Sequence, residues 1–298
     1  MKMRCSVILL SGLLAASGVR AGQIQSLGTD GTTIGQMMAK KAAKAAESGQ
    51  PRSRHAIFLD TPLTAFLFQG AGSLAGANGT FFHSDVSIAN YRSVAQRIGI
   101  GWLALGVDNS NESLQFFSIP ANTTAFLDDF VTATLGKSGF GAVLVFGVDN
   151  FGNNDGAAVL DGQSRIWTFQ PGSSGKVSLG LPSVDLDDES GFSPAFALGL
   201  RQDASARTNV GIVNLDTNGI AHTFTVTARG LNKTATFTVK VPALSVNQVA
   251  IPAGTYGDLS LQITADADGF SWSAYGVSVD SITGDSWVSH VNQPFRIF

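Results

Sequence analysis

The second half of this chain repeats the first, and this repeat constrains the fold more than any other feature. Four pairs of segments match in the same order: Ser84–Asn90 with Thr208–Asn214, Phe116–Pro120 with Thr238–Pro242, Phe140–Val145 with Tyr256–Leu261, and Leu160–Trp167 with Val279–Trp287. The offset between the copies drifts only slightly, as loop insertions and deletions would produce. We therefore expect one supersecondary plan used twice.

From about residue 55 onward, apolar and polar residues alternate with period two. The alternation is clearest in Thr223–Thr227 and Phe237–Val241, and turns rich in Gly, Asn and Asp separate such segments at short intervals. The sequence therefore predicts an all-β fold with two tandem antiparallel β-sandwich modules. We place the modules at 55–182 and 193–298, joined by an acidic linker at 183–192.

The N-terminal 21 residues have the pattern of a secretory signal peptide. Lys2 and Arg4 precede a short apolar run at Val7–Leu14, and small residues lead up to a cleavage site after Ala21. The single cysteine, Cys5, lies in this peptide. We expect a secreted protein, extracellular or periplasmic, whose mature chain has no disulfide and no transmembrane segment.

Residues 22–54 are predicted to form a helical spacer between the signal peptide and the first module. The helical pattern covers Thr32–Ser48, with a threonine available as N-cap and Gly49 and Pro51 after its end. Its apolar side has no aromatic anchor, so a loosely docked spacer is favoured over a membrane-surface helix.

The charge balance excludes one class of partner. Three of the 19 basic residues and none of the 22 acidic ones lie in the first 21 residues, so the remainder carries a net charge of about −6. No basic patch is present, and we expect no nucleic-acid binding.

The motifs of common enzymes are absent from the sequence. None of the four histidines has a second histidine two or four residues away, and no G-x-S-x-G motif occurs. We expect no catalytic residue and no cofactor, with calcium as the one ion to consider.

The candidate calcium ligands are Asp185, Asp187, Asp188 and Glu189, which crowd the predicted linker. Oxygen-rich loops of this kind can hold calcium, but the spacing lacks the glycine and the terminal glutamate of a complete calcium loop. A solvated linker is the favoured interpretation.

A glycan-acting enzyme is one alternative, because such enzymes need two carboxylates facing each other across a cleft. The available pairs are Asp128 with Asp129, and Asp161 with Asp280. The matched segments place Asp161 and Asp280 at equivalent positions in the two modules. A turn or strand-end role in both modules is then the simpler interpretation.

A carbohydrate-binding module is the other alternative, because exposed Trp or Tyr rings stack on sugars. The candidate rings are Trp102, Trp167, Trp272, Tyr275 and Trp287. The matched segments also pair Trp167 with Trp287, which favours a shared packing role for both. The Phe81–Phe82 and Phe116–Phe117 pairs must place one ring on each face of a strand.

Three segments resemble a family of exported bacterial proteins with tandem β-sandwich modules: GANGTFFHSDVSIAN at 76–90, SRIWT at 164–168 and LGLRQDASARTNVGIVN at 198–214. The resemblance covers about residues 55–290 and implies a secreted, non-enzymatic module without assigned functional residues. We expect a structural or adhesive component that contacts a cell-surface or extracellular polymer or protein. A localised function should lie where the two copies differ, at 70–79, 150–156 or 185–189.

Overall fold

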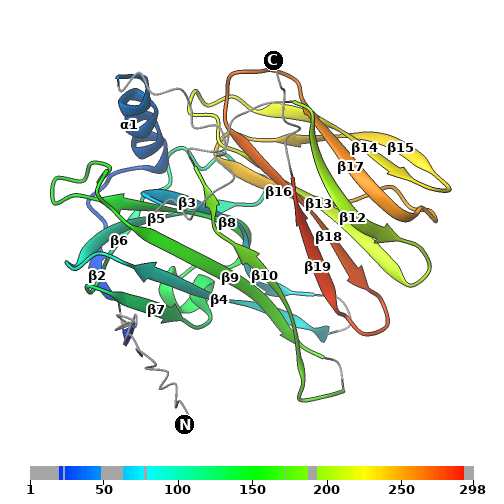
Figure 1. The fold of residues 1–298 in the computed structure, drawn as a ribbon, viewed down its shortest axis with the longest axis horizontal. Coiled ribbons are helices and arrows are strands. Elements are labelled where there is room, and N and C mark those ends of the chain that lie inside the picture. Colours follow the sequence, from blue (N-terminus) through cyan, green and yellow to red (C-terminus); the bar gives the residue numbers. More distant parts are fainter. Residues whose placement is uncertain are drawn as a thin grey trace, which may run out of the picture.

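The computed structural model describes residues 20–22, 24–47, 63–76, 79–170, 172–186 and 193–291. Residues 1–19 of the predicted signal peptide lie outside this part. The described chain is mostly β-strand, with antiparallel sheets packed as sandwiches (Figure 1). The predicted all-β sandwich class is confirmed.

The first sandwich consists of two sheets with strand orders β3-β8-β5-β6 and β7-β4-β9-β10. The bounds are β3 Ala65–Ala75, β4 Phe81–Asn90, β5 Gln96–Ala104, β6 Gln115–Ile119, β7 Thr123–Leu127, β8 Gly139–Val148, β9 Leu160–Phe169 and β10 Lys176–Pro182. The two sheets join at one end, where β3 pairs with β4 through Leu74–Phe82 and Ala75–Phe81. Their interior is apolar and includes Phe66, Ile88 and Val145.

The second sandwich repeats this plan strand for strand. Its sheets have the orders β12-β17-β14-β15 and β16-β13-β18-β19, so each strand corresponds to the one nine numbers earlier. The bounds are β12 Ala195–Gln202, β13 Ala206–Asn214, β14 His222–Gly230, β15 Thr234–Val241, β16 Ser245–Ala250, β17 Gly257–Ala265, β18 Trp272–Asp280 and β19 Ser286–His290. The predicted internal repeat is therefore present in three dimensions.

The pairing register corrects the last two of the four matched segments. Gly147 lies opposite Ile98, and Ala265 lies opposite the equivalent Phe224, so Phe140 corresponds to Asp258 and not to Tyr256. Asn90 of β4 lies opposite Leu160, whereas the equivalent Asn214 of β13 lies opposite Trp272. Leu160 therefore corresponds to Trp272, and Asp161 and Asp280 lie at opposite ends of equivalent strands. The last match joined β9 to a segment, Val279–Trp287, that contains the end of β18, a turn and the start of β19.

A buried asparagine closes the same corner in both sandwiches. Asn90 Nδ2 donates to the carbonyls of Val94, Ile119 and Pro120 at 2.9–3.2 Å. Asn214 Nδ2 donates in the same way to the carbonyls of Ile220, Val241 and Pro242 at 2.9–3.1 Å. Both side chains are fully buried. This device explains why the S/T-x-V-x-I-x-N and I/V-P segments recur together.

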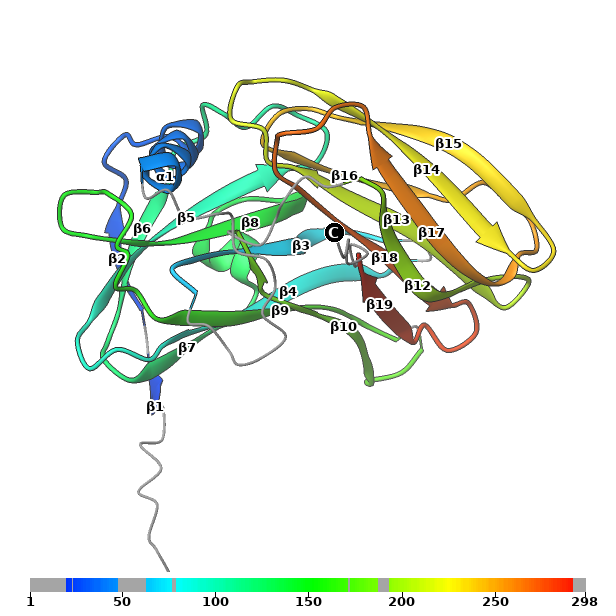
Figure 2. The ribbon, with the colours of Figure 1, turned by 45° about the horizontal axis from the view of Figure 1, so that its top comes forward.

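The two sandwiches share an apolar layer of side chains. Figure 2 shows the backbones of the two modules side by side. The outer face of the β3-β8-β5-β6 sheet packs against α1 (Ile34–Glu47) and against the second sandwich. Leu144 and Phe146 of β8 meet Val213, Leu244 and Val246 from the second sandwich in one buried cluster. The modules are therefore packed together rather than tethered.

The helix is part of this layer and not a spacer, which corrects the sequence interpretation. Ile34, Met37 and Met38 are buried in the cluster. Thr33 caps the helix, since its Oγ1 accepts from Gln36 N at 3.2 Å and its own N–H bonds Gln36 Oε1 at 3.0 Å. Aliphatic and methionine side chains suffice to dock this helix on the sheet, so the absence of an aromatic residue on its apolar side did not indicate loose docking.

Short strands extend the first sandwich at its edges. These are β1 (Arg20–Gly22), which pairs with β7, β2 (Gln25–Gly28), which pairs with β6, and β11 (Val184–Asp185), which pairs with β3. The predicted cleavage site after Ala21 falls within β1. β11 also shows that the predicted linker 183–192 begins inside the first sandwich, where Leu186 is buried in the shared layer. A short π-helical turn, η2 (Phe130–Thr134), follows β7.

A buried polar contact crosses the shared boundary. Gln69 of β3 donates from Nε2 to Ser273 Oγ at 2.5 Å and to the carbonyl of Ala274 at 3.0 Å. Its Oε1 accepts from His290 Nδ1 at 2.5 Å. Burial lowers the pKa of His290 below its usual value, because a charged imidazole would lose hydration there.

This contact predicts a pH dependence of stability. His290 binds a proton more readily in the unfolded chain than in the folded one. Its contribution to the free energy of unfolding is therefore complete above about pH 6.5, and it declines as the pH falls toward the pKa of the folded state. We expect the free energy of unfolding to fall less between pH 7.5 and 5.5 in His290→Gln than in the wild type. Urea unfolding at the two pH values measures this. Identical pH dependence in both proteins would contradict the prediction.

Candidate functional site

The candidate site lies where two neighbouring strands of the first sandwich separate. β4 pairs with β9 up to His83, opposite Trp167, and β4 then pairs with β3 through Phe81 and Phe82. β9 continues instead in its hairpin with β10. The divergence leaves a gap between the β3–β4 and β9–β10 hairpins.

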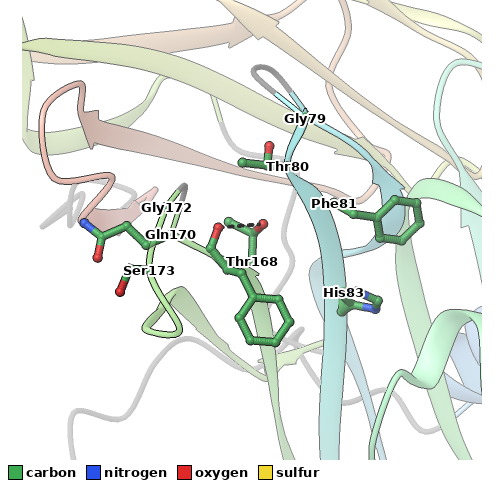
Figure 3. Close-up of a pocket in the computed structure, with 9 residues that line it drawn as sticks. Gly79, Thr80, Phe81, His83, Thr168, Gln170, Gly172 and Ser173 are labelled. Carbon is green, nitrogen blue, oxygen red and sulfur yellow. Dashed lines mark hydrogen bonds between the residues drawn. The ribbon is translucent and has the colours of Figure 1, made fainter.

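A shallow pocket of about 330 Å³ occupies this gap. Figure 3 shows it between the strand that carries Phe81 and His83 and the hairpin that carries Thr168, Gln170 and Ser173. The lining residues are Gly79, Thr80, Phe81, His83, Thr168, Phe169, Gln170, Gly172 and Ser173. The pocket thus combines phenyl rings with hydroxyl and amide groups.

Aromatic rings form a row on the outer face beside the pocket. The His83 ring stacks on Trp167 with centroids 4.6 Å apart, and Phe81 lies 4.9 Å from His83 on the same strand. Phe169 contacts Trp167 edge-on at 5.4 Å. Trp167 is only 9 % exposed, whereas Phe81 and Phe169 are 45 % and 51 % exposed. The two phenylalanines therefore present the open ring surface.

The charged groups around the row are mostly paired. His83 Nδ1 lies 3.0 Å from Asp129 Oδ1, and Arg165 pairs with Asp85 at 2.6 Å. Burial alone would raise the pKa of Asp85, but Trp167, Arg165 and the Asp129 amide favour the carboxylate and hold the pKa below its usual range. Asp85 thus stays ionised and bound to Arg165 at neutral pH.

Lys176 stands apart from these pairs. Its ammonium lies 3.5 Å from the centroid of the Trp167 ring and 5.5 Å from that of Phe169, which is a cation–π arrangement. Within the part of the chain that the structure describes, no carboxylate forms an ion pair with it. The side chain is exposed, so its ammonium is open to a ligand.

The second sandwich provides an internal comparison for these positions. His83 and Trp167 form a cross-strand pair, and the equivalent pair in the second sandwich is Arg207 and Val279. Two residues further on, Phe169 corresponds to Ser281. The same framework therefore folds without the aromatic row, and the row belongs to the first sandwich alone.

A longer β3–β4 hairpin borders the pocket. Between the equivalent positions Ser73 and His83 the first sandwich has nine residues, whereas the second has four between Gln202 and Arg207. This insertion contains much of the segment 70–79, one of three where we expected function because the copies differ. A second such segment, 150–156, contacts α1, since Lys44 Nζ donates to the carbonyl of Asn154 at 3.3 Å.

The rings considered as a sugar-stacking platform are mostly covered. Trp102, Trp167, Trp272 and Tyr275 are buried, and Trp287 is half-buried with its Nε1 donating to the carbonyl of Gly199 at 2.9 Å. Of the phenylalanine pairs, Phe81 does project outward, but Phe116 and Phe117 are both buried, on opposite faces of β6. Sequence reasoning attended to Trp and Tyr and missed Phe169, His83 and Lys176.

The candidate catalytic carboxylates do not converge. Asp161 Oδ1 accepts from Gly162 N at 2.6 Å and Ser183 Oγ at 2.8 Å, and Asp280 Oδ1 accepts from the N–H groups of the β18–β19 turn. Backbone donors in that turn lower the pKa of Asp280. Asp128 is exposed beside Asp129, whose partner is His83. Asp161 and Asp280 thus stabilise local structure.

The calcium hypothesis stays a prediction. Asp185 is half-buried in β11, while Asp187, Asp188 and Glu189 lie outside the described residues. Among the residues described, no three His, Cys, Asp or Glu side chains are arranged to hold a metal ion.

Two comparisons bear on the class of protein. No protein-family model and no curated protein matches this sequence. Within the described ranges, no helix is long and apolar enough to cross a membrane. The resemblance to exported tandem β-sandwich proteins stays a prediction from the segments quoted above.

Proposed function

We propose that this protein is a non-enzymatic interaction protein, secreted or held at the cell envelope, that contacts a cell-surface or extracellular polymer or protein in a structural or adhesive role. The observation that carries the proposal is the aromatic pocket of the first sandwich. The second sandwich has the same framework without it, so packing does not require these rings. Solvent-exposed rings beside polar groups are typical of binding surfaces.

Two further observations support an interaction role. The rings next to the pocket stand on paired strands, β4 and β9, and such a preformed surface loses less entropy on binding. Asp161 and Asp280, which we considered for glycan hydrolysis, stabilise a strand end and a turn. Among the described residues, these candidate carboxylates do not face each other across a cleft, so this observation does not favour the enzyme alternative.

A binding screen tests this function. The purified full-length chain is incubated with insoluble and immobilised polysaccharides, cell-wall polymers, matrix proteins and whole cells, with and without calcium. We expect specific retention on at least one of them and no change in the polymer itself. No retention on any of them, or release of soluble products, would contradict the proposal.

A further inference from the structure

We propose that the pocket between the β3–β4 and β9–β10 hairpins binds an acidic polysaccharide, with Lys176 pairing with a uronate carboxylate and Phe169 and Phe81 contacting the sugar rings. The inference rests on the proposed function, because it names the polymer class that such an interaction protein would bind at this place.

The charge requirement follows from Lys176. Its ammonium is held over Trp167 at 3.5 Å and remains exposed. The acidic side chains beside the aromatic row, Asp129 and Asp85, are engaged by His83 and Arg165. A carboxylate on a ligand would supply the counter-charge that the described chain does not.

The sugar requirement follows from the remaining surface. Phe169 and Phe81 expose about half of their area, and the Lys176 ammonium lies 5.5 Å from the Phe169 ring. An apolar ring face is matched by the C–H face of a pyranose. Thr80, Gln170 and Ser173 line the pocket and add hydroxyl and amide groups that both donate and accept. A few polar groups set among apolar surface are the usual composition of a site that orients a ligand.

An extended peptide fits this site less well. Peptides that bind sheets use a row of free backbone groups along a strand edge. β9 stays paired with β4 up to Trp167 and with β10 from Gln163 to Phe169. Among the described residues of β9, only Thr168 and Phe169 lie beyond the pairing with β4. Side chains and not a row of backbone groups therefore dominate this part of the surface.

Binding of polygalacturonate, compared with its fully methyl-esterified form, tests the inference. The two polymers share their rings, but only the first carries charge. Using isothermal titration with the full-length chain, we expect at least about tenfold weaker binding of the ester. We also expect Lys176→Gln and Phe169→Ala each to weaken polygalacturonate binding about tenfold.

Two control variants in the second sandwich accompany these. Lys240→Gln removes an exposed lysine, and Ile282→Ala removes an apolar side chain that is 82 % exposed. Neither should change binding. Thermal unfolding of all four variants checks the fold, which these exposed positions should leave intact.

Four outcomes would overturn the inference. Equal affinity for both polymers would remove the role of Lys176. Equal losses with the controls would place binding elsewhere, and tighter binding to poly-glutamate would indicate an acidic peptide. If neither polymer binds while the broad screen finds another partner, the inference fails and the proposed function stands. Retention on nothing in the screen overturns the function itself.

Discussion

Replacing Asn90 or Asn214 by leucine is expected to destabilise the protein by about 4 kcal/mol in each case. Each amide donates to three carbonyls, and leucine leaves all three without that donor. An unpaired buried carbonyl costs about 1–3 kcal/mol, and water can reach some of these groups, which keeps the total near the lower end.

The measurement is urea unfolding followed by circular dichroism. Asn111→Leu serves as the control, because Asn111 is exposed in a loop, and it should change stability by less than about 0.5 kcal/mol. The two corners are equivalent, so the two losses should agree within about 1 kcal/mol. A loss below 1 kcal/mol at either corner would show that the repeated asparagine is not the device that closes it.

Placing a charge in the layer between the modules should have the second large effect. Val246 is fully buried there, beside Leu144 and Leu244. Val246→Asp buries a carboxylate without a partner, so we expect a loss of more than about 4 kcal/mol. Differential scanning calorimetry should show a lower unfolding temperature and a broader or split transition.

Thr238→Asp is the matched control for that variant. Thr238 lies on the exposed face of β15, so the same charge meets solvent and should change stability by less than about 0.5 kcal/mol. If both variants unfold like the wild type, the buried layer does not contribute to stability and the modules would be independent.

Much of the fold could be predicted from the sequence because the patterns that define it are local. Alternation in segments such as Thr223–Thr227 requires a half-buried strand, and the recurrence of Ser84–Asn90 as Thr208–Asn214 marks equivalent strands. Register was harder to predict, because a short local match does not define which strand a residue belongs to or its position along that strand. The segment Val279–Trp287 was matched with β9, but it contains the end of β18, a turn and the start of β19. This is why Asp161 was matched with Asp280, although the two lie at opposite ends of equivalent strands.

The packing of the modules and the candidate site depend on contacts that no local pattern contains. Phe116 and Phe117 read alike in the sequence, yet one faces the shared layer and the other the interior of the first sandwich. The Lys176 ammonium is held over the ring of Trp167, which lies nine residues earlier on the paired strand β9. The location was nevertheless suggested by the principle that function should lie where the copies differ, since the pocket borders the insertion between Ser73 and His83.

The claim that two equivalent sandwiches fold as one body is tested most directly by hydrogen exchange. Mass spectrometry follows exchange at increasing urea concentrations in peptides from β4 and β13, the equivalent central strands of the two modules. The shared layer of α1, Leu144 and Val246 predicts that both strands lose protection in the same urea transition. Loss of protection in β13 at a clearly lower urea concentration than in β4, or the reverse, would contradict it.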